Sequence, residues 1–289
     1  MNPILRELVE LLGLERLEEN LFRGQSQDLG WGNVFGGQVL GQALSACQQT
    51  VPEGRLVHSL HGYFLRTGDA RRPIVYEVDP IRDGKSFTTR RVRAIQGGRA
   101  IFNLSASFQK QEAGFEHQDK MPETPDPDSL LSERELAQKY ADRIPEMFRK
   151  RALAERPIEA KPVERNNPLQ PQKQPAYRRV WYRAVDALPD ALPLHQYLLA
   201  YASDFNFLGT TMNPHGVSWL QPNMQVASLD HAMWFHRPFR MDEWLLYEID
   251  SPSASGARGL ARGKFFSRDG RLVASCVQEG LIRRWEQGR

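Results

Sequence analysis

The sequence has almost no cysteine and no long hydrophobic run. Only Cys47 and Cys276 occur among its 289 residues, which excludes a disulfide framework and a four-cysteine zinc site and predicts two reduced core thiols. No run approaches the roughly 18 apolar residues of a membrane-spanning helix. The N-terminal residues mix charges with leucines, unlike a signal peptide. We therefore expect a soluble, cytoplasmic protein with no membrane span.

The excess of charge of one sign is also small. The chain has 38 Lys and Arg against 35 Asp and Glu, a net charge of +3. That excess is too small to predict a nucleic-acid partner, although it is compatible with an anionic small ligand. The composition, 40% hydrophobic and 25% charged, excludes collagen-like and disordered chains. At about 150 residues per domain, the length predicts roughly two domains.

The first part of the chain predicts helices followed by strands. Asn2 and Pro3 are typical of a helix start, and Asn33 is a candidate cap for a second, glycine-rich helix over residues 34–49. Glycines inside a helix indicate that another backbone or a ligand approaches closely. Segments rich in β-branched and aromatic residues then predict strands, at residues 56–65, 74–79, 87–94 and 99–109. Their hairpin-length connections indicate an antiparallel α+β unit.

Residues 112–175 differ in composition from the rest of the chain. They hold nine of the 19 prolines, mixed with charged residues. We predict a proline-rich linker here, with one helix that begins at the capping box of Ser132 and Glu135. The linker separates an N-terminal unit, residues 1–111, from a C-terminal unit, residues 176–289.

The second half of the chain repeats the pattern of the first. Three short matches occur in the same order, with offsets of 169, 171 and 172 residues: 59–61 with 228–230, 76–79 with 247–250, and 98–99 with 270–271. One match could arise by chance, but the ordered set indicates an internal duplication. The predicted architecture is therefore two copies of a helix-plus-antiparallel-sheet unit.

Five segments resemble the acyl-CoA thioesterase II family: residues 21–26 (LFRGQS), 34–39 (VFGGQV), 58–65 (HSLHGYFL), 82–87 (RDGKSF) and 228–236 (SLDHAMWFH). The resemblance covers nearly the whole chain and is weakest across 112–175. It implies an α+β double hotdog, two fused units that each wrap a curved antiparallel sheet around a long helix. It also implies hydrolysis of acyl-CoA to free fatty acid and CoA, without a metal or organic cofactor.

The resemblance implies three catalytic residues in the second half. Asp204 matches the family's aspartate and Gln278 its glutamine, while Ser228 stands where the family has a threonine. Asp204 is the only acid in residues 193–209, and burial would raise its pKa toward that of a general base; a helix cap is the alternative. Together these residues would activate and position the attacking water.

Gln278 is predicted to share one strand face with Ala274 and Cys276, where small neighbours leave room for a ligand. The alternative is a polar residue on a solvent-exposed face. The aligned position in the first half is Ala106, and residues 34–49 contain no acid. We therefore expect one catalytic site per chain.

Gly36 and Gly37 are candidate substrate-binding residues. They open the predicted second helix, and a helix N-terminus favours negative charge. The resemblance implies that this end polarises the thioester carbonyl, while close helix–sheet packing explains the glycines equally well.

His58 is the third candidate substrate-binding residue and the rival to Asp204 as the base, with a purely structural histidine as the alternative. His58 and His61 are an odd number of residues apart, so an ordinary strand would point them to opposite faces. The same holds for His231 and His236. We therefore expect no metal site.

The seven basic residues of the predicted strands and their turns are either contacts for CoA phosphates or solvated strand faces: Arg90, Arg91, Arg93, Arg258, Arg262, Lys264 and Arg268. Two other functions stay open at this point. One is a non-catalytic acyl-CoA binding protein, and the other is a hotdog enoyl-CoA hydratase, which needs an Asp–His pair on the catalytic helix. Exposed sheet edges predict a homodimer or homotetramer.

Overall fold

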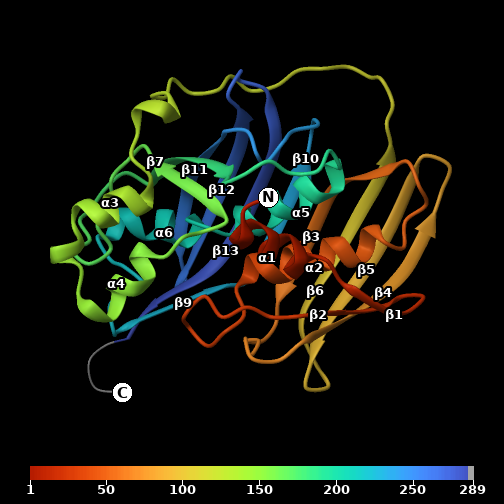
Figure 1. Cartoon of the computed structure of the whole chain (residues 1–289), viewed down its shortest axis with the longest axis horizontal. Coiled ribbons are helices and arrows are strands. Elements are labelled where there is room, and N and C mark those ends of the chain that lie inside the picture. Colours follow the sequence, from red (N-terminus) through yellow and green to blue (C-terminus); the bar gives the residue numbers. More distant parts are fainter. Residues whose placement is uncertain (286–289) are drawn as a thin grey trace.

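The computed structural model describes residues 1–285, which form one large antiparallel sheet with two helices packed against it (Figure 1). The first half contains α1 (Pro3–Leu12), β1 (Glu15–Glu18), β2 (Leu21–Gly24), α2 (Gly36–Gln48), β3 (Arg55–Phe64), β4 (Ile74–Asp83), β5 (Phe87–Gln96) and β6 (Arg99–Lys110). The second half contains β8 (Tyr177–Ala184), α5 (Leu192–Ser203), α6 (Phe207–Met212), the 3-10 turn η3 (Asn213–His215), β9 (Met224–Ser228), β10 (Asp230–Phe235), β11 (Leu245–Ser255), β12 (Arg258–Ser267) and β13 (Leu272–Arg284).

The order of the strands reflects the predicted duplication. In the described part of the chain the sheet runs β1-β2-β4-β5-β6-β3-β10-β13-β12-β11-β8-β7, with β9 also paired to β13. The two halves meet where β3 pairs with β10, with Ala232 opposite His61. On either side of this junction the same order appears, β3-β6-β5-β4 in one direction and β10-β13-β12-β11 in the other. The expected α+β double hotdog is confirmed.

Helices α2 and α5 lie side by side in front of the sheet, at the centre of Figure 1. Glycines allow their backbones to approach closely. A Cβ atom at Gly37 would lie 2.2 Å from the carbonyl oxygen of Tyr201, and one at Gly41 would lie 3.1 Å from that of Tyr197. The glycine-rich sequence of α2 therefore marks the approach of another backbone, as predicted.

The start of α2 differs from the prediction. Asn33 is not its cap, because the helix begins one residue after Phe35, which supplies no side-chain hydrogen bond. Asn33 instead forms an isolated bridge with Asp69. The loop in front of α2 is held by this bridge and by Asp28, whose carboxylate accepts three backbone N–H groups of residues 30–32.

The segment 112–175 contains more structure than the single predicted helix. The predicted capping box is present, with Ser132 at the start of α3 (Glu133–Lys139). The prediction of one helix was wrong, because η1 (Pro127–Ser129), η2 (Ala141–Arg143), α4 (Glu146–Leu153) and β7 (Ile158–Pro162) lie there too. Strand β7 extends the sheet by pairing with β8. The limits of the two units stay a prediction.

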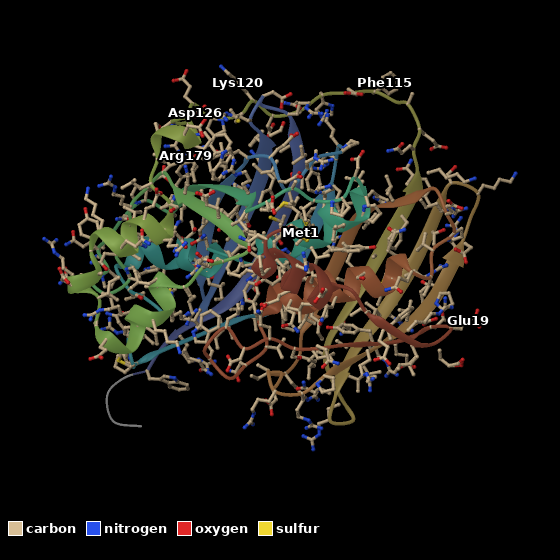
Figure 2. All side chains as sticks on the ribbon, in the orientation of Figure 1. Met1, Glu19, Phe115, Lys120, Asp126 and Arg179 are labelled. Atoms are coloured by element: carbon tan, nitrogen blue, oxygen red, sulfur yellow. The ribbon has the colours of Figure 1, made fainter. Side chains whose placement is uncertain are left out.

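The extended first part of this segment crosses from the first half of the molecule, near Phe115, to the second half, where Figure 2 shows Lys120 and Asp126. The indole of Trp181 donates to the carbonyl of Pro125 at 3.0 Å, and Arg268 pairs with Asp126 at 2.7 Å. A small apolar cluster lies beneath it, formed by Trp181, Trp244, Leu246, Phe266 and Leu272. The segment thus covers a sheet face that would otherwise expose apolar side chains. None of the helices in residues 1–285 is long and apolar enough to cross a membrane.

Candidate active site

Asp204 connects the two helices. It is the C-terminal cap residue of α5, so it does end a helix. Its side chain, however, reaches the start of the other helix, where the N–H of Gly37 donates to Oδ2 at 3.0 Å. The unpaired N–H groups and the dipole of a helix N-terminus stabilise a carboxylate in this position. The first half of the chain therefore contributes directly to the surroundings of Asp204.

The glycine pair at the start of α2 is required by this contact. A Cβ atom at Gly36 would lie 2.6 Å from Oδ2 of Asp204, and one at Gly37 would meet the carbonyl oxygen of Tyr201 at 2.2 Å. The close-packing alternative is confirmed, whereas contact of Gly36 and Gly37 with a thioester carbonyl stays a prediction. The charge that the Gly37 N–H binds is the carboxylate of Asp204 itself.

The three predicted catalytic residues lie together. Ser228 ends β9, and its hydroxyl donates to Oδ1 of Asp204 over a long 3.4 Å contact. Gln278 lies in β13, which pairs with β9, and its Nε2 donates to the Ser228 hydroxyl at 2.8 Å. A carboxylate, a hydroxyl and an amide thus converge from α5, β9 and β13.

Gln278 is fully buried, as are Ala274 and Cys276 on the same face of β13. The predicted inward face is confirmed, and a solvent-exposed Gln278 is excluded. The amide faces Ser228 and Asp204 on one side and His231 on the other.

Burial dominates the electrostatics of Asp204. It raises the pKa of the carboxyl group from 3.8 to about 6, while hydrogen bonds from Gln278, Gly37 and Ser228 act in the opposite direction. A carboxylate with a pKa near 6 is mostly ionised at neutral pH, yet it is a much better base than an exposed aspartate. With a hydroxyl and an amide beside it, the carboxylate can hold a water molecule and accept a proton from it.

His58 does not join this group. It hydrogen-bonds Ser107 at 2.8 Å and packs edge-on against Phe87, on the sheet face away from α2. The end of β3 near the site is Phe64, and six residues at about 3.3 Å each place His58 roughly 20 Å away along the strand. The prediction that His58 and His61 lie on opposite faces was wrong, because a bulge between Val57 and Ser59 places both on the outer face of the sheet. The geometry gives no support for a substrate-binding role of His58.

Sequence reasoning missed a second layer of polar groups behind Gln278. His231 and His236 do lie on opposite faces of the sheet, as predicted, one buried and one exposed. The Nδ1 atom of His231 lies 2.6 Å from Oε1 of Gln278, and its Nε2 lies 2.9 Å from Oγ of Ser203. The pairing of β10 with β13 creates this contact. The one indication in the sequence was that His231 lies close to Ser228, within the segment 228–236.

The seven basic residues of the strands all have acidic partners. The pairs are Arg90–Asp83, Arg91–Asp79, Arg93–Glu77, Arg258–Glu279, Arg262–Asp250, Lys264–Asp119 and Arg268–Asp126. Most lie on the outer sheet face and at its turns, where opposite charges on neighbouring strands neutralise each other. The structure favours a structural role for these residues over contacts with phosphate.

In the first half of the chain, an arginine lies in the region that corresponds to the site of Asp204, Ser228 and Gln278. Strand pairing puts Gln278 opposite Ala261, whereas Ala106, the counterpart of Gln278, lies opposite Arg90. The Arg90 side chain is almost completely buried. The first half has no amide at the position that corresponds to Gln278.

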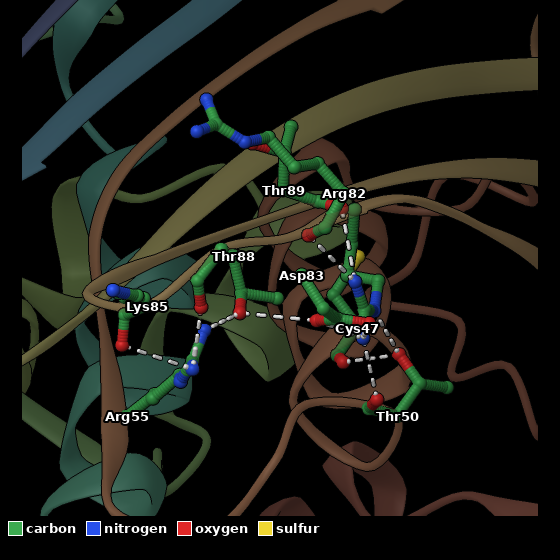
Figure 3. Close-up of polar contacts among 10 residues, drawn as sticks. Cys47, Thr50, Arg55, Arg82, Asp83, Lys85, Thr88 and Thr89 are labelled. Atoms are coloured by element: carbon green, nitrogen blue, oxygen red, sulfur yellow. Dashed lines mark hydrogen bonds and ion pairs between the residues drawn. The ribbon is translucent and has the colours of Figure 1, made fainter.

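The Arg90 guanidinium closes the C-terminal end of α2. Figure 3 shows its partners Asp83 and Thr50 near Cys47, in the last turn of that helix. The guanidinium donates to both oxygens of Asp83, at 2.9 and 3.1 Å, and to the carbonyl and hydroxyl of Thr50, at 2.9 and 3.0 Å. An ion pair thus occupies the volume that the second half uses for its carboxylate, hydroxyl and amide. This arrangement supports the prediction of one catalytic site per chain.

The donors available at the site do not resemble a metal centre. Among residues 1–285, no three His, Cys, Asp or Glu side chains gather closely enough to bind a metal ion. Asp204 has one hydroxyl and one amide as its neighbours, which are groups suited to positioning water.

Comparisons with known proteins agree on one family. The family described as "Acyl-CoA thioesterase" matches residues 147–281, and the family described as "Acyl-CoA thioesterase N-terminal domain" matches residues 26–109. The chain is 46% identical to "Acyl-CoA thioesterase 2" of Haemophilus influenzae, over 98% of this chain and 99% of the relative. It is 42% identical to human "Acyl-coenzyme A thioesterase 8", over 94% and 88% of the two chains.

A solved structure supports the same assignment. The acyl-CoA thioesterase II TesB2 of Mycobacterium marinum superposes with a TM-score of 0.78 at 44% identity, covering 97% of this chain and all of the other. Because the identity is this high over both halves of the chain, the match shows the family and not only the fold. This chain therefore belongs to the acyl-CoA thioesterase family and is a thioester hydrolase with the double hotdog fold.

Proposed function

We propose that Asp204 is the general base that activates water for hydrolysis of acyl-CoA in this chain. The observation that carries the proposal is a partly buried carboxylate with a pKa of about 6, in contact with a hydroxyl and near an amide. Its relatives are named as acyl-CoA thioesterases, which supports acyl-CoA as the substrate class.

Ser228 and Gln278 position the reacting groups. The Ser228 hydroxyl already touches both Asp204 and Gln278, so a water molecule bound beside it would lie within reach of the carboxylate. The amide of Gln278 has a second N–H, which faces Asp204 and can donate to the oxyanion that forms on the thioester carbonyl beside it. The positive end of α2 adds a favourable potential for that oxyanion.

The reaction then proceeds in two steps with no covalent enzyme intermediate. Asp204 takes one proton from water while the oxygen attacks the thioester carbonyl, which becomes a tetrahedral oxyanion. The carbonyl re-forms as the C–S bond breaks, and the CoA thiolate leaves and takes up the proton from Asp204. A thiol pKa of about 8.5 makes the thiolate a good leaving group, so no strong general acid is needed.

Asp204→Asn tests the proposal, with release of free thiol from acyl-CoA as the assay. We expect kcat to fall by at least about 100-fold, the usual contribution of a general base. Asp250→Asn, which removes an exposed partner of Arg262, is the matched control and should keep normal turnover.

Near-normal turnover in a folded Asp204→Asn variant would contradict the proposal. Stoichiometric binding of acyl-CoA by the unaltered chain without thiol release would indicate a binding protein instead. Loss of an enoyl double bond without thiol release would indicate a hydratase.

A further inference from the structure

His231 lies directly behind Gln278 and has no part in the mechanism above. It is 1% exposed on β10, and its ring packs against Phe207 with centroids 5.6 Å apart. Nδ1 lies 2.6 Å from Oε1 of Gln278, and Nε2 lies 2.9 Å from Oγ of Ser203. The imidazole therefore links the last residue of α5 to the strand that carries Gln278.

The directions of these hydrogen bonds follow from the carboxylate. Ionised Asp204 only accepts, so the Ser228 hydroxyl donates to it and must accept from Nε2 of Gln278. Oε1 of Gln278 then faces His231, and because a carbonyl oxygen only accepts, Nδ1 of His231 carries a proton. Burial lowers the pKa of His231 to about 4, so the ring is neutral and has only this one N–H.

The same atoms permit one competing arrangement. The Ser203 hydroxyl has two possible acceptors, Nε2 of His231 at 2.9 Å and the carbonyl of Ala200 at 2.8 Å. If it donated to Ala200, His231 would carry its proton on Nε2 and accept an N–H of Gln278 through Nδ1. The carbonyl oxygen of Gln278 would then face Ser228, and the site would lose its amide donors.

We propose that His231 is a positioning residue, whose Nδ1–H holds the Gln278 amide with its N–H groups facing Ser228 and the substrate. The tautomer of this imidazole decides which end of Gln278 faces the site. The inference rests on the proposed function, because His231 acts only through Gln278.

The first test compares His231→Asn with His231→Leu. The two replacements have the same branched shape, but asparagine places an amide N–H near the position of Nδ1 and leucine has no donor. We expect kcat for thiol release to be about tenfold lower with leucine than with asparagine, as for one lost positioning hydrogen bond. KM should agree within about twofold, since substrate contacts are unchanged. Equal kcat values in the two folded variants would overturn the proposal.

The same pair in a Gln278→Ala background separates positioning from packing. If His231 acts through Gln278, the difference between asparagine and leucine should shrink to less than about twofold. A difference that stays near tenfold would show that His231 acts on the fold rather than on Gln278. If Gln278→Ala alone leaves kcat unchanged, the proposed function of Gln278 fails instead.

A spectroscopic measurement needs no altered active site. In ¹⁵N NMR of the unaltered chain, the His231 signals should show the neutral Nδ1–H tautomer; His231→Asn identifies them by their loss. The Nε2–H tautomer would contradict the proposal. This measurement decides the question even where the leucine variant is unstable.

Discussion

The carboxyl group of Asp204 is partly buried at the end of α5, and its loss of solvent contact costs folding free energy. Its pKa in the folded chain, about 6, lies above the ordinary 3.8, so the folded state binds this proton more tightly than the unfolded state does. The free energy of unfolding that this tighter proton binding contributes is fully present below pH 3.8. About 3 kcal/mol of it is lost as the pH rises through 6. The chain thus gives up stability to keep a strong base at neutral pH.

Ser228 has a hydroxyl where the family has the hydroxyl and methyl of threonine. Because the hydroxyl lies between Asp204 and Gln278, its loss should matter more than the added methyl. We expect Ser228→Thr to keep kcat within about threefold of normal, whereas Ser228→Val, of the same shape without a hydroxyl, should lose about tenfold or more. Thiol release measures both. Equal rates in the two variants would rule out a role for the hydroxyl.

Individual residues differed in how far the sequence could identify them. Asp204, Ser228 and Gln278 followed from the resemblance to the thioesterase family, and the structure brings them together. His231 was considered only as a metal ligand, because its contact with Gln278 depends on strand pairing. His58 was a candidate because it lies in a recognisable motif, yet a bulge turns it to the far face of the sheet.

The contact between α2 and α5 positions the site at the level of whole elements. Gly36 lies where any side chain would displace the carboxylate of Asp204, with a Cβ position 2.6 Å from Oδ2 and 3.1 Å from the ring of Phe64. Placement of the general base therefore depends on the first residue of a helix in the other half.

Gly36→Ala should reduce activity more than stability. The carboxylate must move by several tenths of an ångström, so we expect kcat to fall at least about tenfold, as small misplacements do in active sites. Gly209→Ala is the matched control, since its Cβ would meet nothing closer than 4.0 Å, and alanine favours a helix. Thiol release and thermal unfolding measure both variants. Unchanged kcat in Gly36→Ala would argue against this placement of the base.

The elements themselves were largely predictable. Alternating and β-branched segments gave strands β3 to β6 within a few residues, because period and turn residues are local signals. The start of α2 was not predictable from local signals, because Asn33 pairs with Asp69, which lies far away in the sequence. Strand β7 escaped prediction because a short edge strand depends on its neighbour β8.

At the scale of the whole molecule, one fold occurs twice, and only the second copy carries the proposed catalytic residues. The second half places Gln278 beside Ala261, and the first half places Arg90 beside Ala106. The duplication was predictable from ordered sequence matches, whereas the exchange of an amide for an ion pair depends on cross-strand neighbours. The expected homodimer or homotetramer stays a prediction; the outermost strands, exposed β1 and proline-ended β7, are poor edges for pairing.

Arg90→Met should lower stability without affecting catalysis. The change leaves the Asp83 carboxylate and the Thr50 carbonyl without their donor, and since Asp83 is half exposed we expect a loss of about 2 kcal/mol. The turnover number should stay within about twofold of normal, because Arg90 lies at the opposite end of α2 from Asp204. Chemical unfolding and thiol release measure the two effects. A large loss of kcat in the folded variant would show that the first half has a catalytic role of its own.

The pH dependence of kcat tests the central claim most directly, that Asp204 with its raised pKa acts as general base. The measurement is thiol release at saturating acyl-CoA from pH 4.5 to 8, on chains whose fold is checked at each pH. We predict that kcat rises tenfold per pH unit at the acid end and reaches a plateau with a midpoint near 6, where Asp204 ionises. A rate that stays nearly constant down to pH 4.5, as expected for an ordinary aspartate with a pKa of 3.8, would contradict this account.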